Sequence, residues 1–347
     1  MCIRDRLLVA LALRRLLRKC LPAMVARAGR LVAQLSLRSK GKQLLSFYQV
    51  ATRISSVYDV PMPAAVASLL SVFELFNINI GGIGLPLQCM GLGTYEQQLT
   101  TTMLAPLALA AVLVLGFLLR GSYCRKGVGA SLLAALPWLL SLSFLVFPMV
   151  SSAAFRAFSC EDFDTGRAFL FADYSVECST ADFTSEVHER AKTLAYVGIA
   201  LYPCGISLLY VVLLLRARHA ILSAKPTALS RALSFLVRDY EAGYFWWELL
   251  EAWKKLFLVG FMVLIMPGEI QQLMIAFIFS LVYFLLVSVA APFKDRGDDF
   301  FAKACGFSLA ALFFFSVILQ VGVLTEAVDS TLSVQVRDRF SFDASFV

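Results

Sequence analysis

Side chains that could form a metal or catalytic centre are scarce in this chain of 347 residues. Its two histidines, His188 and His219, are far apart in the sequence. Zinc prefers clustered nitrogen or sulfur ligands at tetrahedral spacing, and neither histidine has a partner for such a site. Haem-ligating and intramembrane-hydrolase functions fail for the same reason. The sequence therefore predicts no enzyme activity, no metal centre and no cofactor.

Three polar side chains interrupt an apolar stretch. Glu74 is a lone carboxylate near the middle of residues 64–84, and Asn77 and Asn79 follow about one turn later. A charge inside a bilayer is costly, so an ionisable residue at that depth is a candidate for a permeation or substrate path. Glycines and Pro86 follow closely, so a re-entrant or interfacial segment is the alternative.

The longest mixed run of aromatic and charged residues covers 240–256. On a helix, Glu251 would reach Lys255 four residues on, and Glu248 would reach it seven residues on. Tryptophans at headgroup level anchor helices at a membrane interface. The run is interpreted as an interfacial anchor or as a gating and coupling helix, with these residues in that role: Trp246, Trp247, Glu248, Glu251, Lys254 and Lys255.

Among eight cysteines, one pair has a spacing that suits a disulfide. Cys160 and Cys178 flank the segment 161–177, and a bridge closing a loop of that length stabilises by about 3 kcal/mol in the chain-entropy model. Cys89 could replace one of them, or all three could stay reduced. The acids after Cys160 lack an EF-hand pattern, so a solvated acidic loop is favoured over a Ca²⁺ site.

A helix kink is expected at Pro203 and Gly205, which lie inside an apolar stretch. Proline removes a backbone hydrogen bond and bends a helix. The kink could serve as a hinge or as a static packing feature.

The composition points to a membrane protein. Hydrophobic residues make up 59% and charged residues 16%, against about 45–50% and about 25% in soluble domains. A spanning helix needs about 20 apolar residues. The expected fold is an all-α, polytopic transmembrane helical bundle with about seven spans, at 64–84, 102–120, 129–150, 193–215, 252–267, 270–292 and 302–324.

Basic side chains in the connections predict the orientation. Residues 1–60, 120–126 and 216–240 are rich in Lys and Arg, whereas 151–191 is acidic. Alternate crossings place the basic connections on one side, so the N-terminus is expected in the cytoplasm and the loop 151–191 outside. G-protein-coupled receptors have the opposite orientation, which excludes that class.

The flanking segments carry separate expectations. Residues 1–6 look like a sequencing-adapter artefact outside the fold. Residues 7–62 are expected to form a basic cytoplasmic amphipathic region that contacts anionic inner-leaflet lipids, and nucleic acid is not an expected partner. The membrane domain would cover 63–324. Residues 325–347 would form an outside segment, truncated at its end.

Several short runs occur in a consistent order: Lys42–Val50, Val57–Pro61, Phe73–Asn79, Leu85–Cys89, Phe158–Cys160, Asp173–Cys178, Tyr202–Ile206 and Trp246–Glu248 with Lys254–Leu256. Together they resemble the membrane domain of TRP-like (transient receptor potential-like) proteins of protists, which are related to the fungal TRP-like flavin-carrier family. The resemblance covers about residues 40–324 and implies a helical, channel-like domain. The link at 267–269 is too short for a TRP pore loop, so such a loop would have to follow residue 324.

The resemblance leads us to expect a TRP-like cation channel or transport domain with Ca²⁺ as the permeant ion, able to form a homo-oligomer. One alternative is a non-conducting membrane anchor of a surface receptor or adhesion protein. Another is a flavin or lipid carrier. The plasma membrane is favoured over an internal membrane.

Overall fold

The computed structural model describes residues 36–58, 60, 94–125, 127–163, 166–180, 183–265 and 267–331, with side chains up to 322. In these ranges, five helices are long and apolar enough to cross a membrane: Tyr95–Tyr123, Val128–Arg156, Glu186–Leu222, Ile270–Ala290 and Arg296–Gly322. They contain or largely overlap five of the seven predicted spans, so the chain has the features of a helical multi-pass membrane protein. The predicted span 64–84, with Glu74, Asn77 and Asn79, lies outside the described residues, as does Cys89.

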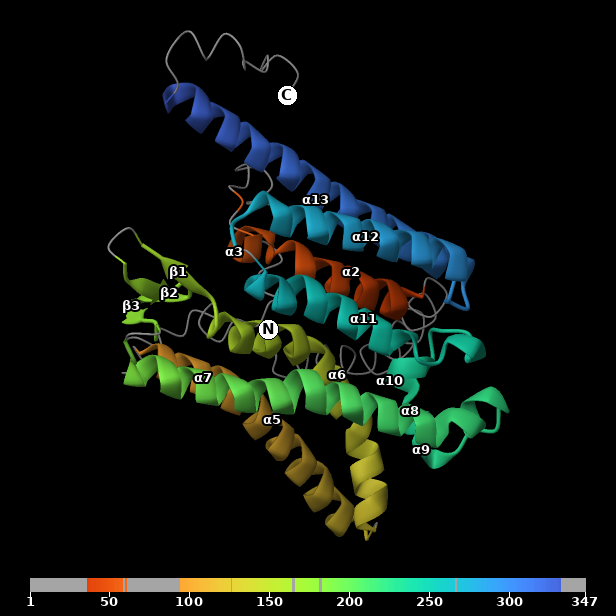
Figure 1. Ribbon diagram of the computed structural model, residues 1–347. Coiled ribbons are helices and arrows are strands. Elements are labelled where there is room, and N and C mark those ends of the chain that lie inside the picture. The colour runs from red at the N-terminus through yellow and green to blue at the C-terminus, as the bar shows by residue number, and fades with distance from the viewer. Residues whose placement is uncertain are drawn as a thin grey trace, which may run out of the picture.

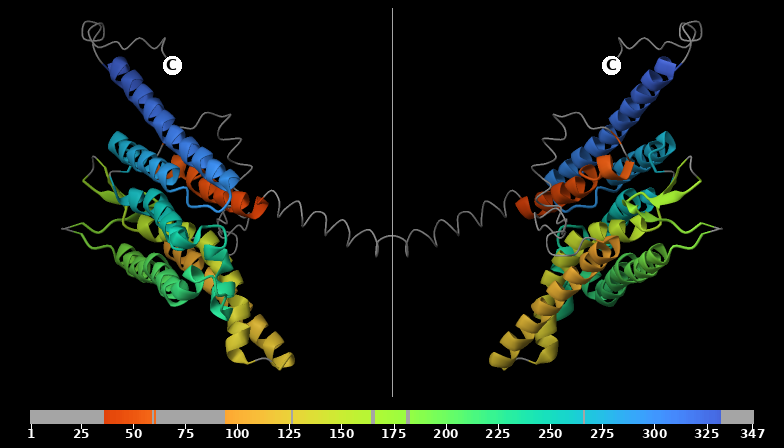
Figure 2. Two further views of the ribbon diagram at one scale, coloured as in Figure 1. Left: turned by 90° about the vertical axis from the view of Figure 1, so that its right-hand side faces the viewer. Right: turned by 90° about the vertical axis from the view of Figure 1, so that its left-hand side faces the viewer.

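The first group of helices contains an antiparallel pair, α5 (Tyr95–Tyr123) and α6 (Val128–Arg156). Beside it runs one long segment made of α7 (Glu186–Ile199), the π-helix η1 (Ala200–Ile206) and α8 (Ser207–Leu222). Figure 1 shows α5 and α6 diverging from the other helices toward the turn that joins them, and Figure 2 confirms this from the side.

The second group consists of α2 (Leu37–Ala51), α3 (Ile54–Tyr58), α11 (Trp247–Lys255), α12 (Ile270–Ala290) and α13 (Arg296–Thr331). The helix α2 lies between α11 and the α12–α13 pair (Figure 1). Most of the expected basic amphipathic region, residues 7–35, lies outside the described residues, and α2 comes from its last part. The polar face of α2 is buried against α6, α11 and α13, because hydrogen-bond partners for that face lie on those helices.

The predicted span 252–267 is a broken helix. After α11 the backbone continues as the π-helix η3 (Leu256–Gly260) and the 3₁₀ turn η4 (Phe261–Leu264). A β-carbon at Gly260 would lie 3.0 Å from the Phe155 ring, so this segment packs tightly against α6 and a larger residue would require the ring to move. At Pro203 and Gly205, where a kink is expected, the backbone forms the π-helix η1 within one continuous segment, which accommodates a residue without an N–H.

One end of the molecule, here called the hairpin end, carries a small antiparallel sheet. Its strands are β1 (Cys160–Asp162), β2 (Ala168–Leu170) and β3 (Asp173–Glu177), in the order β1-β2-β3. Cys160 pairs with Leu170 in the register of the first two strands.

The opposite end, here called the basic end, carries α9 (Ala228–Ala232), α10 (Ser234–Val237) and the 3₁₀ turn η2 (Ala242–Tyr244). Its basic residues in the described ranges include Arg216, Arg218, Lys225, Arg231, Arg238, Lys294 and Arg296, and Arg120 and Arg125 lie at the turn between α5 and α6.

The segment α2–α3 connects the two ends. At the basic end, Ser36 donates to Asp298 across 2.6 Å. At the hairpin end, Arg156 donates to the Ser56 carbonyl and hydroxyl oxygens at 3.3 and 3.1 Å. In the described residues, α2–α3 therefore runs from one end to the other among the five candidate spanning helices. It is a polar segment that apolar runs do not reveal.

Candidate functional site: a buried polar network

The network begins with an ion pair between Lys42 of α2 and Glu248 of α11. Glu248 is 1% exposed and also accepts a hydrogen bond from the Tyr240 hydroxyl at 2.9 Å. Lys42 donates to the Phe235 carbonyl at 2.9 Å, and its ammonium lies 4.5 Å from the ring centroid of that residue. Burial, reinforced by the nearby carboxylates of Glu248 and Glu251, raises the pKa of Tyr240 well above its usual value, so its hydroxyl remains a donor.

One turn further along α11, the Glu251 carboxylate accepts from three donors, which lie on α11, α2 and α12. Lys254 forms an ion pair with it at 2.6 Å, and Ser46 of α2 donates to the same oxygen at 3.3 Å. The Tyr283 hydroxyl of α12 donates to the other oxygen. Tyr283 is seven residues from the end of α12 at Ala290, a depth of about 10 Å at 1.5 Å per residue. These donors supply both oxygens of the buried carboxylate with partners.

The deepest charge is Lys255, which is 1% exposed. Its ammonium donates to Gln49 Oε1 at 3.1 Å and lies 3.6 Å from the centroid of the Phe144 ring. Gln49 Nε2 donates to the Leu145 carbonyl at 3.3 Å, so Gln49 links α2, α6 and α11. In the described ranges Lys255 forms no ion pair, and its ammonium is held by Gln49 instead.

Two small cavities lie along this network. One of about 30 Å³ is lined by Gln43, Glu251, Lys254, Ser280 and Tyr283, among others. The hydroxyl of Ser280 and the carbonyl oxygen of Gln43 are buried there without a hydrogen-bond partner among the described atoms. The second, of about 10 Å³, lies on the other side of Gln43. A water needs at least about 10–15 Å³ and polar partners, which the larger cavity provides.

The polar residues of α2 that line these cavities or bond to the network form one stripe along the helix. This stripe is here called the polar file and consists of Ser39, Lys42, Gln43, Ser46 and Gln49. Toward the hairpin end the file stops at a tightly packed apolar cluster that includes Ile54, Tyr58, Leu258, Met262 and Phe313. The polar interior is thus closed on the hairpin side by side chains from α3, η3, η4 and α13.

The structure distributes the predicted anchor residues between lipid-facing surface and core. Trp246 is 41% exposed, as an interfacial anchor requires, whereas Trp247 is buried. Glu251 pairs with Lys254 rather than with Lys255, and Glu248 pairs with Lys42. Sequence reasoning missed Lys42 and Gln49, although polar residues recurring three or four positions apart on α2 were a usable signal.

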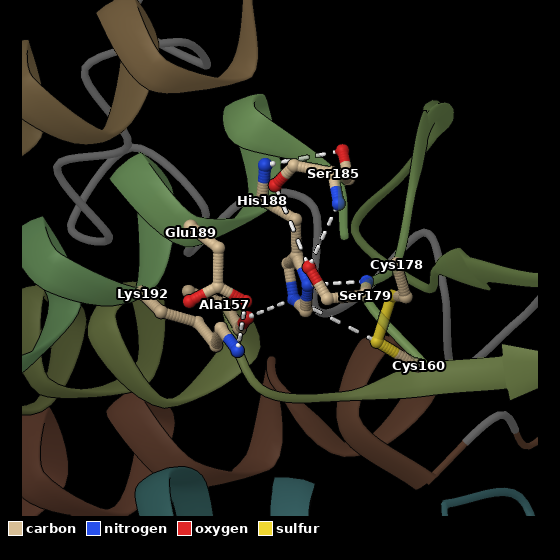
Figure 3. The surroundings of a disulfide bond; sticks show 8 residues. All are labelled: Ala157, Cys160, Cys178, Ser179, Ser185, His188, Glu189 and Lys192. Carbon is tan, nitrogen blue, oxygen red and sulfur yellow. Dashed lines mark hydrogen bonds and ion pairs between the residues drawn. A yellow bond between two sulfur atoms is a disulfide. The ribbon is translucent and has the colours of Figure 1, made fainter. Parts of the chain in front are cut away.

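The predicted disulfide joins Cys160 and Cys178 at the hairpin end. Figure 3 shows His188 beside it. His188 Nδ1 accepts from the Ser179 N–H at 2.9 Å, so Nε2 carries the proton and donates to the Ala157 carbonyl at 3.2 Å. Both ring nitrogens are therefore engaged. The sulfur and nitrogen atoms of Cys160, Cys178 and His188 lie within 4.8 Å of one another, but sulfurs in a disulfide are not thiolate ligands.

Comparison with models of known protein families, with curated proteins and with solved structures finds no match to this chain.

Proposed function

We propose that this chain is a membrane transport domain that moves protons or monovalent cations along the polar file of α2. The observation that carries the proposal is the group of five ionisable side chains held inside a helical membrane bundle: Lys42, Glu248, Glu251, Lys254 and Lys255. Such residues are rare within membranes and mark ion and proton paths. A domain that only anchors another protein has no need of them.

The charges favour protons or monovalent ions over Ca²⁺. Each carboxylate of the network is already paired with a lysine, whereas Ca²⁺ takes six to eight oxygen ligands. The Ca²⁺ permeation that the TRP-like resemblance implies would need further carboxylates, and Glu74 is the sequence candidate for one. The disulfide-bonded hairpin supports a location at the plasma membrane or in a membrane of the secretory pathway, because the outer face of the first and the lumen of the second are oxidising.

A second candidate is the non-conducting anchor of a surface protein. It is favoured by the rigid hairpin end, where Phe163 and Tyr174 are exposed and packed edge to face. That function requires no ion movement and predicts tolerance of charge removal in the network.

Flux through proteoliposomes tests the proposal. We expect purified protein to carry H⁺ or K⁺, and Glu251→Gln to reduce the flux at least tenfold, because the carboxylate that Lys254, Ser46 and Tyr283 contact is lost. Glu241→Gln is the matched control, since this exposed glutamate is at the same end of the molecule.

Flux no greater than that of empty liposomes would overturn the proposal in favour of the anchor. Equal flux in Glu251→Gln and wild-type protein would remove the network from the path. Labelling of Cys305, which lines the 30 Å³ cavity, by a water-soluble thiol reagent added at the basic end would support a hydrated interior.

A further inference from the structure

An apolar groove of about 380 Å³ lies between the broken helix α11–η3–η4 and α12. Five of its eight lining residues are aromatic: Trp253, Phe257, Phe261, Phe279 and Tyr283. Trp253 and Phe261 are 49% and 44% exposed. In a protein that spans a bilayer, an apolar opening on the side of the helices meets acyl chains rather than water.

The groove has a polar end and an apolar end. Because α11 runs away from the basic end and α12 runs back toward it, Leu250, Lys254 and Tyr283 lie nearest that end. The stacked rings of Phe257 and Phe279, with centroids 4.2 Å apart, follow, and Phe261 lies furthest toward the hairpin end. This polarity matches a lipid whose headgroup lies at the basic end and whose chain points to the middle of the bilayer.

Lys254 is the charged group of the groove. An ammonium has three donors, and the described residues supply it with one acceptor, Glu251. Its other recorded contact is the face of the Tyr283 ring, 4.4 Å from the centroid. The groove continues past Lys254 to Leu250, about one turn nearer to the basic end, so a phosphate can approach the ammonium from headgroup level.

We infer that this groove binds one anionic phospholipid from the leaflet at the basic end, with an acyl chain along Phe257, Phe261 and Phe279 and the phosphate at Lys254. Charge complementarity selects this occupant, since Lys254 is the charged residue of the groove lining and the basic end nearby carries further Lys and Arg side chains. Cytoplasmic leaflets are rich in anionic lipids, which Lys and Arg attract.

Lys254 and Tyr283 also line the 30 Å³ cavity, so they separate the groove from the polar file. A phosphate at Lys254 would compete with Glu251 for the ammonium. The bound lipid would therefore change the ion pair of Lys254 with Glu251 directly, without a conformational change elsewhere in the protein. The inference of the lipid site itself does not depend on the transport proposal.

Photo-crosslinking tests the site. The full chain is placed in nanodiscs with phosphatidylserine that carries a diazirine on its acyl chain, or with phosphatidylcholine carrying the same probe. We expect at least fivefold more crosslinking from phosphatidylserine, mapped to peptides with Phe257, Phe261 or Phe279. Lys254→Gln should abolish this preference, whereas Lys254→Arg should retain it.

A second variant pair tests the apolar part. Phe279→Trp adds bulk in the groove and should lower the crosslinking several-fold, while Phe315→Trp on the exposed face of α13 should leave it unchanged. Equal labelling by the two lipids in wild-type protein would overturn the inference. So would crosslinks from a diazirine amino acid at Phe261 to residues 61–93 or to a second copy of the chain. Lipid selectivity without measurable ion flux would retain this site while rejecting transport.

Discussion

Lys42 and Glu248 illustrate how a buried charge depends on its partner. Their side chains are 12% and 2% exposed, and α2 and α11 each supply one member. Removing one partner of a buried ion pair leaves the other uncompensated and costs about 3–5 kcal/mol, whereas replacing both with apolar residues is often neutral. The pair is therefore better viewed as a specific link between two helices than as a net source of stability.

We accordingly expect Lys42→Met to lower the free energy of unfolding by about 3–5 kcal/mol, and the double variant Lys42→Met/Glu248→Met to recover most of that loss. Unfolding by SDS in mixed micelles provides the measurement. The exposed pair Arg190–Glu186 is the control, and Arg190→Met should change stability by less than about 1 kcal/mol. A double variant as unstable as the single one would contradict this explanation.

His188 has a structural role, because its imidazole links two backbone groups beside the disulfide. Its substitution by alanine leaves the Ser179 N–H and the Ala157 carbonyl without their partners. We expect a thermal unfolding measurement on His188→Ala to report a loss of about 1–3 kcal/mol. His219→Ala, at an exposed position, should have no such effect. With the disulfide intact, EDTA should leave the unfolding temperature unchanged, and a shift on chelation would reveal a metal at this position.

At the scale of elements, hydrogen bonds from outside the segment hold the consecutive turns η3 and η4. The Tyr58 hydroxyl donates to the Leu258 carbonyl at 2.8 Å. Gln272 Nε2 of α12 donates to the carbonyls of Val57 and Met262 at 3.2 and 2.6 Å. Wide turns such as η3 recur at functional sites, and here η3 shapes the wall of the groove while its neighbours close the polar file.

Tyr58→Phe removes one of these hydrogen bonds without changing the shape of the core. We expect it to cost about 0.5–1.5 kcal/mol, with the larger values if the buried carbonyl stays unpaired. Tyr123→Phe, where the side chain is 92% exposed, is the matched control. Equal stability of both variants in SDS titrations would show that the Tyr58 hydroxyl does not hold the π-helix.

For the whole molecule, the position of α2–α3 is the most consequential result. Ser36 contacts Asp298 at the basic end, and Ser56 contacts Arg156 at the hairpin end, so the segment runs the length of the bundle. Tyr95, where α5 begins, belongs to the apolar cluster of the hairpin end. Residues 60 and 94, which flank the segment 61–93, therefore lie at the same end of the molecule.

Site-directed labelling in intact cells can check this arrangement. In a background without other reactive thiols, we expect Arg38→Cys to react with a membrane-impermeant reagent from the same side as Arg125→Cys. Ser55→Cys should react from the opposite side, together with Asp173→Cys. Reaction of Arg38→Cys and Ser55→Cys from one side would mean that α2–α3 does not cross the membrane.

Some properties of this protein follow from short stretches of sequence. Long apolar runs predict five of the candidate spanning helices, because a helix with few charges is stable in a bilayer wherever it occurs in the chain. Loop length and the oxidising side of the membrane predict the bridge between Cys160 and Cys178. At Pro203 the sequence predicts a kink, and the structure has a π-helix there, since the missing N–H acts within its own helix.

Only the tertiary structure decided which charges meet. Lys42 and Glu248 are 206 positions apart, and no local pattern indicates that they pair. Lys254 and Lys255 are both within reach of Glu251 on one helix. In the assembled bundle Lys255 donates to Gln49 of α2, and Lys254 forms the ion pair with Glu251. A polar helix such as α2 is stable inside the bundle only when distant segments supply its partners, so its place follows from the assembled fold and not from its own residues.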